Sequence, residues 1–298
     1  MTKFSNAQCR RLANDVINAT TITEQIQLLS DAIDNLPSDA PGWKTALLKL
    51  KLWLIDARMR GFDNAKLAFK VFAKGNGKLP FWSFSTLPGT TCPGAGECLS
   101  FCYSFTSWRF PSSFCRQLQN TILIMSEDGR ERIAQEFNAL RIGAIVRLYV
   151  DGDFDSVQTV EFWFALLATR EDIWAYGYSK SWVELLAYAE SGVAFPQNYV
   201  LNLSSGSLHG DDMRSRMASL PITRGEFRAV AIDTEGLPNG VKRYDDRVYH
   251  DRVRKASLEQ TGQRVFSCPG KCGSCRFASG MHACGDKNFI VPIAIGIH

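Results

Sequence analysis

The sequence lacks any stretch that is long and apolar enough to cross a membrane. No run reaches about eighteen unbroken apolar residues, the length that a membrane-spanning helix needs. The N-terminus, MTKFSNAQCRRLANDVINA, also lacks the basic segment followed by an apolar segment that is typical of a signal peptide. These two absences predict a cytoplasmic protein with no membrane partner.

Several catalytic signatures are missing as well. The chain shows no Ser/His/Asp order of a hydrolase, no Walker loop and no glycosidase-like pair of carboxylates. A net charge of only +4 permits a nucleic-acid partner but does not predict one. The length of 298 residues allows one large α/β domain, or a domain of about 200 residues with a smaller appendage.

Cysteine, by contrast, is well represented. The sequence has nine cysteines, and in a reducing cytoplasm such residues are more often metal ligands or catalytic thiols than disulfides. Seven of them form two tight groups: Cys92, Cys98 and Cys102, and then Cys268, Cys272, Cys275 and Cys284. Only Cys9 and Cys115 stand apart. The spacing therefore predicts two metal sites.

The first group lies in the loop-like segment TCPGAGECLSFCY at residues 91–103. Thiolates are soft ligands that favour zinc, copper(I) or iron–sulfur clusters, and Gly94 and Gly96 allow the backbone to wrap around one centre. Three cysteines that hold an iron–sulfur cluster leave one iron open to a small chelating ligand, unless Cys115 supplies a fourth sulfur. The alternative, buried thiols in a core, fits this composition less well.

The second group has the full ligand count of a closed site. Four cysteines can hold a tetrahedral zinc ion or an auxiliary iron–sulfur cluster, and the spacing does not separate the two. His282 could replace one cysteine, although a lone histidine in a loop is more often solvated. A further alternative is that the two groups lie together in space and share one four-cysteine cluster.

Residues 1–77 are predicted to form a helical N-terminal region. Apolar residues recur at helical spacing over residues 23–36, 43–60 and 65–73. No group of reactive side chains stands out there. We therefore interpret this region as a helical cap on the main domain, with partner recognition as the second interpretation.

Residues 78–298 alternate between short β-rich runs and helices. We expect strands at 80–85, 145–150, 173–178, 199–203, 227–232 and 289–295. Such alternation predicts βαβ units and a mostly parallel sheet. Because several strands carry a polar or aromatic face opposite an aliphatic one, a partial (β/α)6 barrel is favoured over a doubly wound sheet. Pro292 indicates that the last strand lies at an edge.

In such a barrel the chemistry lies at the carboxyl ends of the strands. The segments that would surround one opening there are the first cysteine loop and residues 151–154, 178–180, 204–206 and 233–235. Asp151 and Asp153 could accept hydrogen bonds from a ligand amine, or could form a turn with a helix N-cap before Val157.

Side chains that face the inside of the barrel are predicted to line a binding cavity. Trp174, Tyr176 and Tyr178 share one face of their strand, because side chains alternate along a strand. Arg147 and Tyr149 share a face of the preceding strand and are weaker candidates for contact with a substrate.

Four stretches of the sequence resemble one known family. They are KLPFWSFSTLPGTTCPGAGECLSFCYS, RLYVDGDF, WAYGYS and the closing CPGKCGSC. Their arrangement resembles the phage and plasmid family called gene product 88, which looks like a distant relative of radical S-adenosylmethionine enzymes. The resemblance covers roughly residues 78–298, and the N-terminal helices lie outside it.

The wider resemblance implies a mechanism. Three cysteines after the first strand would hold a [4Fe–4S] cluster whose open iron binds S-adenosylmethionine, and an electron from the cluster would cleave this cofactor to a 5′-deoxyadenosyl radical. By this resemblance the iron ligands are Cys92, Cys98 and Cys102, and the cofactor-binding residues are Tyr103, Asp151, Gly152 and Asp153. Two departures are evident: the cysteines are spaced more widely than usual, and Asp-Gly-Asp replaces the usual Gly-Gly-Glu.

Together these patterns predict a cytoplasmic iron–sulfur protein of mobile-element type that acts on an unknown substrate as a radical S-adenosylmethionine-like enzyme. The alternative is a non-catalytic or redox-sensing iron–sulfur protein that binds nucleic acid or a host protein, and a zinc-stabilised interaction protein comes third. One basic run could contact nucleic acid, yet nearby aspartates dilute it, so a solvated helix face is favoured. The run consists of Lys242, Arg243, Arg247, Arg252, Arg254 and Lys255.

Overall fold

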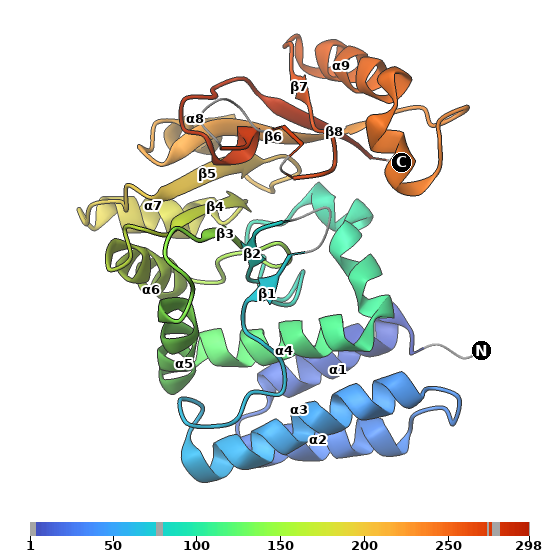
Figure 1. Cartoon of the computed structure of the whole chain (residues 1–298), viewed down its shortest axis with the longest axis vertical. Coiled ribbons are helices and arrows are strands. Elements are labelled where there is room, and N and C mark those ends of the chain that lie inside the picture. Colours follow the sequence, from blue (N-terminus) through green and yellow to red (C-terminus); the bar gives the residue numbers. More distant parts are fainter. Residues whose placement is uncertain (1–3, 76–79, 273, 276–280, 298) are drawn as a thin grey trace.

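The computed structural model describes residues 4–75, 80–272, 274–275 and 281–297. They form a mixed α/β fold around one eight-stranded sheet (Figure 1). In chain order the strands are β1 Ala73–Lys74, β2 Trp82–Ser83, β3 Ile145–Leu148, β4 Trp174–Ser179, β5 Tyr199–Ser204, β6 Thr223–Ala231, β7 Phe266–Ser267 and β8 Ile293–Ile297.

The α-helices that accompany the sheet are α1 Asn6–Asn18, α2 Ile22–Asp34, α3 Pro41–Arg60, α4 Pro111–Met125, α5 Glu127–Asn138, α6 Val157–Ala168, α7 Trp182–Glu190, α8 Asp211–Ala218 and α9 Arg247–Thr261. Short 3-10 helices lie at η1 Glu97–Phe101, η2 Tyr103–Arg109, η3 Gly240–Asp245 and η4 Ala283–Gly285. None of the helices in the described ranges is long and apolar enough to span a membrane.

The sheet is mostly parallel, as the alternation of strands and helices predicts. Its strand order is β1-β2-β3-β4-β5-β6-β8-β7. Among the described pairs of strands in this sheet, only β1–β2 is antiparallel. Strands β2 to β6 and then β8 follow one another across the sheet in chain order, and no described pairing joins β1 to β7.

The prediction that the last strand lies at an edge is wrong. β8 pairs with β6 on one side and with β7 on the other. Pro292 precedes the strand, so its missing N–H removes no bond from the ladder, and its carbonyl accepts the N–H of Phe266 at 2.9 Å. β7 spans only two residues, too few to produce an alternating pattern in the sequence.

Helices α1 to α3 form a layer beside α4 at the end of the molecule opposite α9 (Figure 1). The ring of Trp43 in α3 lies 5.6 Å from the ring of Phe114 in α4. The helices predicted over residues 23–36 and 43–60 are confirmed as α2 and α3. The predicted boundary between residues 77 and 78 lies outside the described residues.

The helix predicted over residues 65–73 is wrong. Residues 61–72 form turns and bends. Gln119 of α4 accepts the N–H of Phe69 at 2.9 Å and donates to its carbonyl at 2.8 Å, so these backbone groups are satisfied without a helix. Several apolar residues of the stretch are nevertheless buried, which explains the helix-like periodicity.

The two faces of the sheet are covered differently. Helices α4 to α7 share one core with β3, β4 and β5. The opposite face presents Trp174, Tyr176 and Tyr178, and the C-terminal segment that contains Cys272 and Cys284 packs directly on it. The cavity that these aromatic side chains were expected to line is therefore covered by the chain itself.

Candidate metal centres

The first cysteine loop lies across the carboxyl ends of the parallel strands. The N–H groups of Gly96 and Cys98 both donate to the carbonyl of Gly206, at 3.1 and 3.3 Å. The N–H of Leu208 donates in return to the carbonyl of Gly94 at 3.1 Å. Backbone bonds therefore attach the loop to the segment that follows β5.

Two glycines are needed for this close packing. A Cβ on Gly94 would lie 1.6 Å from the carbonyl oxygen of Lys180, which follows β4. Gly152 has φ +80°, and a Cβ there would lie 1.9 Å from the hydroxyl oxygen of Thr86. The loops after β2, β3, β4 and β5 thus meet at one end of the sheet, as the parallel topology predicts.

Asp153 joins the ends of β3 and β4. It is 4% exposed, and its Oδ1 accepts the N–H of Phe154 at 2.9 Å while its Oδ2 accepts the N–H of Lys180 at 2.7 Å. Burial raises the pKa of Asp153, and the N–H of Lys180 opposes this effect. The alternative N-cap role falls to Ser156, whose hydroxyl accepts the N–H of Thr159 at 3.3 Å.

Asp151 and Tyr103 fasten the loop to the strand that precedes the Asp-Gly-Asp turn. Asp151 accepts a hydrogen bond from the amide of Gln117 in α4 at 2.9 Å, and burial raises its pKa. The Tyr103 hydroxyl donates to the carbonyl of Val150 at 2.9 Å and accepts from Arg147 at 3.3 Å. The residue as a whole is 61% exposed.

Two thiols of the first group, Cys92 and Cys98, have raised pKa values. Burial raises the pKa of Cys92 to about 12, with the charge of Asp153 as the second cause, and burial also raises the pKa of Cys98. A charge on Cys102 would raise both values further. Even so, nowhere in the described ranges do three His, Cys, Asp or Glu side chains converge closely enough to hold a metal ion.

Cys115 lies apart from this group. It is fully buried in α4, and the thiol that influences its pKa is Cys9 of α1. The proposed role of Cys115 as a fourth ligand therefore finds no support in its position.

The second cysteine group lies on the aromatic face of the sheet. The Tyr176 hydroxyl is 4.0 Å from the sulfur of Cys272, and Asn202 donates to the carbonyl of Cys284 at 2.9 Å. Burial raises the pKa of Cys284 to about 12, and Cys272 and Cys275 raise it further. The structure thus brings these thiols near one another on a packed surface.

Arg224 of β6 is a structural residue that the sequence interpretation missed. It is 4% exposed, and it donates to the side chain of Asn202 at 2.7 Å and to the carbonyls of Phe289 and Val291 at 2.6 and 2.9 Å. It therefore fastens the C-terminal segment to the sheet. The sequence holds no signal for this role, because Arg224 lies outside the strand predicted at 227–232 and only the structure extends that strand back to Thr223.

Arg147 and Tyr149 lie on different faces, contrary to the simple alternation expected along their strand. The guanidinium of Arg147 stacks 4.6 Å from the ring centre of Tyr178. It lies near Tyr103, which follows the first cysteine group, and near Cys272 of the second. Tyr149 has φ +54°, and its hydroxyl accepts the indole N–H of Trp163 in the helix-covered core at 3.0 Å. Tyr149 is therefore a core residue and no candidate for substrate contact.

Comparison with protein families gives a match over most of the chain. The model of the family gene product 88 matches residues 54–280. The chain belongs to this family. The match begins inside α3, earlier than the resemblance from residue 78 suggested, and it ends before Cys284. Searches of curated proteins and of solved structures found no match.

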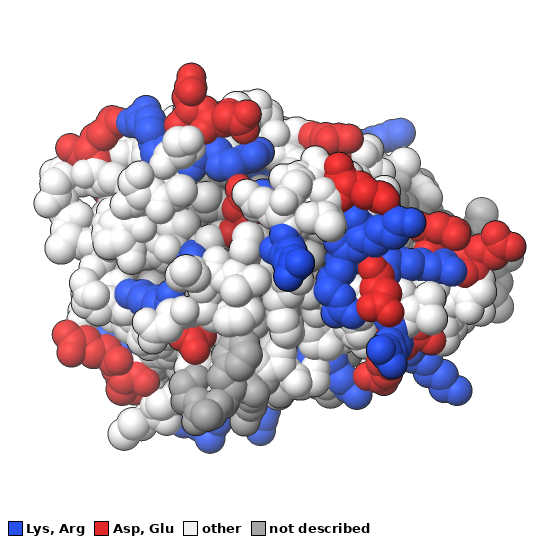
Figure 2. Space-filling view, turned by 90° about the horizontal axis from the view of Figure 1, so that it is seen from above, with Lys and Arg blue, Asp and Glu red and all other residues white. Residues whose placement is uncertain are grey.

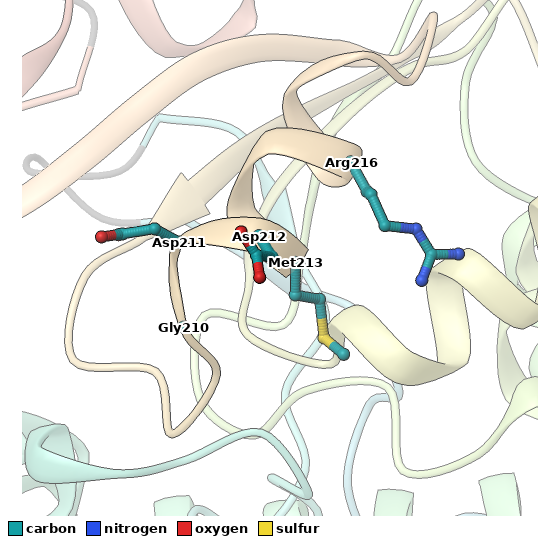
Figure 3. A pocket seen from close by; sticks show the side chains of 5 residues that line it. All are labelled: Gly210, Asp211, Asp212, Met213 and Arg216. Carbon is teal, nitrogen blue, oxygen red and sulfur yellow. The ribbon is translucent and has the colours of Figure 1, made fainter.

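A depression in this gene product 88 chain lies at the start of α8 and has a volume of about 450 Å³. Its lining residues are Gly210, Asp211, Asp212, Met213 and Arg216. Figure 3 shows that the side chains of Asp211 and Arg216 point away from one another. Arg216 pairs with Glu190 at 2.6 Å, so this depression presents no convergent set of reactive groups.

The basic run of this family member is mixed with acidic side chains. Arg254 pairs with Asp251 at 2.5 Å and Arg252 with Asp233 at 3.5 Å. Figure 2 shows blue and red groups interspersed on the face seen from above. The arrangement agrees with an ordinary solvated helix surface, the interpretation that the sequence favours.

Proposed function

We propose that this member of the gene product 88 family is an iron–sulfur protein, and that Cys92, Cys98 and Cys102 bind a [4Fe–4S] cluster. The observation that carries the proposal is the attachment of the first cysteine loop, through Gly94 and Gly206, to the carboxyl ends of parallel strands. Ligands in open α/β sheets and barrels bind at this end.

The donor set fits such a cluster. Thiolates are its ordinary ligands, and a charge on Cys102 would raise the pKa of both Cys92 and Cys98. Their sulfur atoms can move toward a common centre by rotation about single side-chain bonds, while the backbone bonds of the loop stay in place. Three protein ligands would leave one iron open to a small molecule.

We further propose a partial (β/α)6 barrel of the radical S-adenosylmethionine type, because the parallel strands follow one another in chain order. A bound cluster would supply the electron that cleaves S-adenosylmethionine. Around it, Asp153 holds the ends of β3 and β4 together, Gly152 allows their loop to pack on Thr86, and Tyr103 anchors the cysteine loop to Val150. With Asp151 these residues would form the cofactor site.

The C-terminal group would hold a second metal centre, zinc or iron–sulfur. Its four thiols, Cys268, Cys272, Cys275 and Cys284, give a complete ligand set. A closed site packed on the aromatic face suits a structural or electron-transfer role, since no ligand position remains open.

A specific observation favours the alternative of a non-catalytic or redox-sensing protein that binds nucleic acid or a host protein. Both carboxylate oxygens of Asp153 already accept backbone N–H groups. A cofactor amine would have to compete with these bonds. In this alternative the turn is purely structural, and the cluster serves as a sensor.

The test is anaerobic purification from the cytoplasm of an expression host, followed by iron, sulfide and zinc analysis. Electron paramagnetic resonance spectra with and without S-adenosylmethionine then separate the two functions. A reduced-cluster signal that changes with the cofactor supports the enzyme, and an indifferent signal supports the sensor. Zinc without iron would overturn both.

Two cysteine variants assign the iron to the first loop. We expect Cys98→Ala to lose that iron and to keep the metal of the C-terminal group. Cys115→Ala is the matched control, because Cys115 is buried beside Cys9 and should lose no metal. Unchanged iron in Cys98→Ala would contradict the assignment.

A further inference from the structure

An arginine of β3 lies beside the C-terminal cysteine group on the aromatic face of the sheet. Arg147 stands opposite Tyr176 of β4 in the strand register, and the Tyr176 hydroxyl is 4.0 Å from the sulfur of Cys272. The guanidinium of Arg147 stacks 4.6 Å from the ring centre of Tyr178. One positive charge is therefore held among aromatic rings next to Cys272.

A second arginine approaches the same group from β6. Arg224 donates from its Nε to the side-chain oxygen of Asn202 at 2.7 Å, and the amide of Asn202 donates in turn to the carbonyl of Cys284 at 2.9 Å. Arg224 is thus one side chain away from Cys284. The C-terminal cysteines lie beside two guanidinium groups that different strands of the sheet supply.

Neither guanidinium forms an ion pair with a carboxylate in the part of the chain that the structure describes. Arg147 donates to the Tyr103 hydroxyl at 3.3 Å, and Arg224 donates to backbone carbonyls at 2.6 to 3.0 Å. These neutral acceptors satisfy N–H groups but cancel no charge. A positive charge in a packed region without a counterion costs free energy, which a nearby anion would recover.

Asp151 does not fill this role. Burial raises the pKa of Asp151, and the charge of Arg147 opposes this rise, but so does the charge of Arg116. The carboxylate also accepts the amide of Gln117 at 2.9 Å. It is therefore shared among several partners of the first loop and is no dedicated counterion for Arg147.

The thiols are the groups that can supply the missing negative charge. Burial works to lower the pKa of both guanidinium groups. A charge on Cys272 would raise the pKa of Arg147. A charge on Cys284 would do the same for the pKa of Arg224. Four thiolates around a zinc ion, or around a [4Fe–4S]²⁺ core, carry two net negative charges, which two guanidinium groups balance.

This balance also bears on His282 as a replacement ligand. The ring of His282 stacks on Phe81 with centroids 4.8 Å apart, and it lies 4.3 Å from the ring centre of Tyr176. A neutral imidazole in place of one thiolate would reduce the negative charge of the site by one unit. One guanidinium would then lack a counterion, so four thiolates fit the two arginines better.

We propose that the C-terminal group binds its metal through all four thiolates, as a dianion, and that Arg147 and Arg224 are its counterions. The inference rests on the proposed C-terminal metal centre and adds its ligand set and its charge. Arg224 also fastens the backbone of the C-terminal segment, so Arg147 is the better residue for a test. It is a positioning residue, which stabilises the thiolates without touching the metal.

The test is competition for zinc between the full-length protein and a chromogenic chelator. Zinc is the probe because it gives the same net charge as a [4Fe–4S]²⁺ core, and all proteins carry Cys98→Ala so that zinc reports on the C-terminal group. We expect Arg147→Met to weaken zinc binding at least roughly tenfold, the loss of one charge-assisted interaction. Arg147→Lys keeps the charge and should retain most of the affinity. Arg254→Met is the matched control and should change nothing, because Arg254 pairs with Asp251 on α9.

Unfolding curves separate a counterion from a merely structural arginine. Arg147→Met should lose clearly more stability in the zinc-loaded protein than in the metal-free protein, where the charge has no anion to balance. Arg147→Gln replaces it if Arg147→Met does not fold. Equal losses in both forms, unchanged zinc affinity, equal weakening by Arg147→Lys, or failure of both neutral variants to fold would overturn the inference. Absence of zinc binding in the Cys98→Ala protein itself would instead overturn the C-terminal centre, and the inference with it.

Discussion

The first cysteine loop is held mainly through its backbone, whereas the second cysteine segment is held mainly by side chains. Each also has one contact of the other kind: the Tyr103 hydroxyl donates to Val150 in the first, and the N–H of Cys268 donates to the carbonyl of Ala294 in the second. In the first, the N–H groups of Gly96 and Cys98 share the carbonyl of Gly206. In the second, the rings of the aromatic face and the guanidinium of Arg224 make the contacts, and Tyr176 lies against Cys272. Two cysteine groups with the same ligand chemistry are thus held in place by different kinds of contact.

The difference teaches where each group is vulnerable. A contact between two backbones leaves no room for an added Cβ, but it depends little on side-chain size. A contact through aromatic side chains accepts small backbone changes, but it loses stability with every truncated ring. The two regions should therefore fail under different substitutions.

The largest effect is expected from truncation on the aromatic face. Tyr176 is fully buried, and Tyr176→Ala should lower the free energy of unfolding by about 3–5 kcal/mol. It should release the metal of the C-terminal group and spare that of the first loop. Denaturant unfolding and metal analysis check both results.

Tyr176→Phe is the matched control, since among the described residues the hydroxyl's one hydrogen-bond contact is with Cys272 at 4.0 Å. We expect its stability to stay close to that of the unchanged protein. Loss of metal from both groups in Tyr176→Ala would break the comparison and would favour one shared cluster.

A substitution at Gly94 is expected to affect the first cysteine loop and to spare the C-terminal group. The Cβ that Gly94→Ala adds would lie 1.6 Å from the Lys180 carbonyl oxygen, so the loop must shift. We expect this shift to lower the free energy of unfolding by about 1–3 kcal/mol. Metal should be lost from the first loop alone. Gly210→Ala, where a Cβ meets open space and φ is −81°, is the control and should change neither property. A Gly94→Ala protein with both metals intact would contradict the backbone account.

A smaller effect is expected at Asp153. Asp153→Asn replaces one of the two carboxylate oxygens by an amide NH₂ group, so the N–H of Phe154 or of Lys180 would face another N–H. We expect the free energy of unfolding to fall by about 1–2 kcal/mol. Unfolding curves should show the loss, and only the first loop should bind its metal more weakly. Asp155→Asn is the control, because an amide oxygen can still accept the Thr159 hydroxyl now bonded at 2.7 Å. Equal losses in both variants would remove the special role of Asp153.

Much of this fold follows from local sequence patterns. Strands β3, β4 and β5 lie within two residues of the stretches predicted at 145–150, 173–178 and 199–203, whereas β6 begins four residues before the strand predicted at 227–232. The sequence also predicts that four loops meet at one end of the sheet, because parallel strands place their carboxyl ends together. The predicted helix over 65–73 failed because Gln119, far away in sequence, satisfies the backbone there.

The features that decide the function are long-range. The sequence identifies Asp153 as a candidate ligand-binding residue, but only the fold shows that Phe154 and Lys180 occupy both of its oxygens. Likewise, the pattern of Tyr176 and Tyr178 indicates an inner face, but not that the C-terminal segment covers it. Spacing brings cysteines into one loop, whereas their final convergence depends on side-chain rotation and on the metal itself.

The two regions should differ least in the acidity of their most buried thiols. Burial is the first cause in both, and it raises the pKa of Cys92 and of Cys284 from 9.0 to about 12. In metal-free protein both should therefore react slowly with iodoacetamide at pH 8, and faster with each unit of pH up to about 12. Because folding raises both pKa values, these thiols also contribute to the free energy of unfolding. That contribution is fully present below pH 9.0 and is lost as the pH rises through about 12. Mass spectrometry of alkylated peptides checks the rates, with unfolded protein as the reference. Fast labelling of Cys92 beside slow labelling of Cys284 would mean that the backbone-held loop opens in solution, and the comparison between the two regions would then extend from their support to their motion.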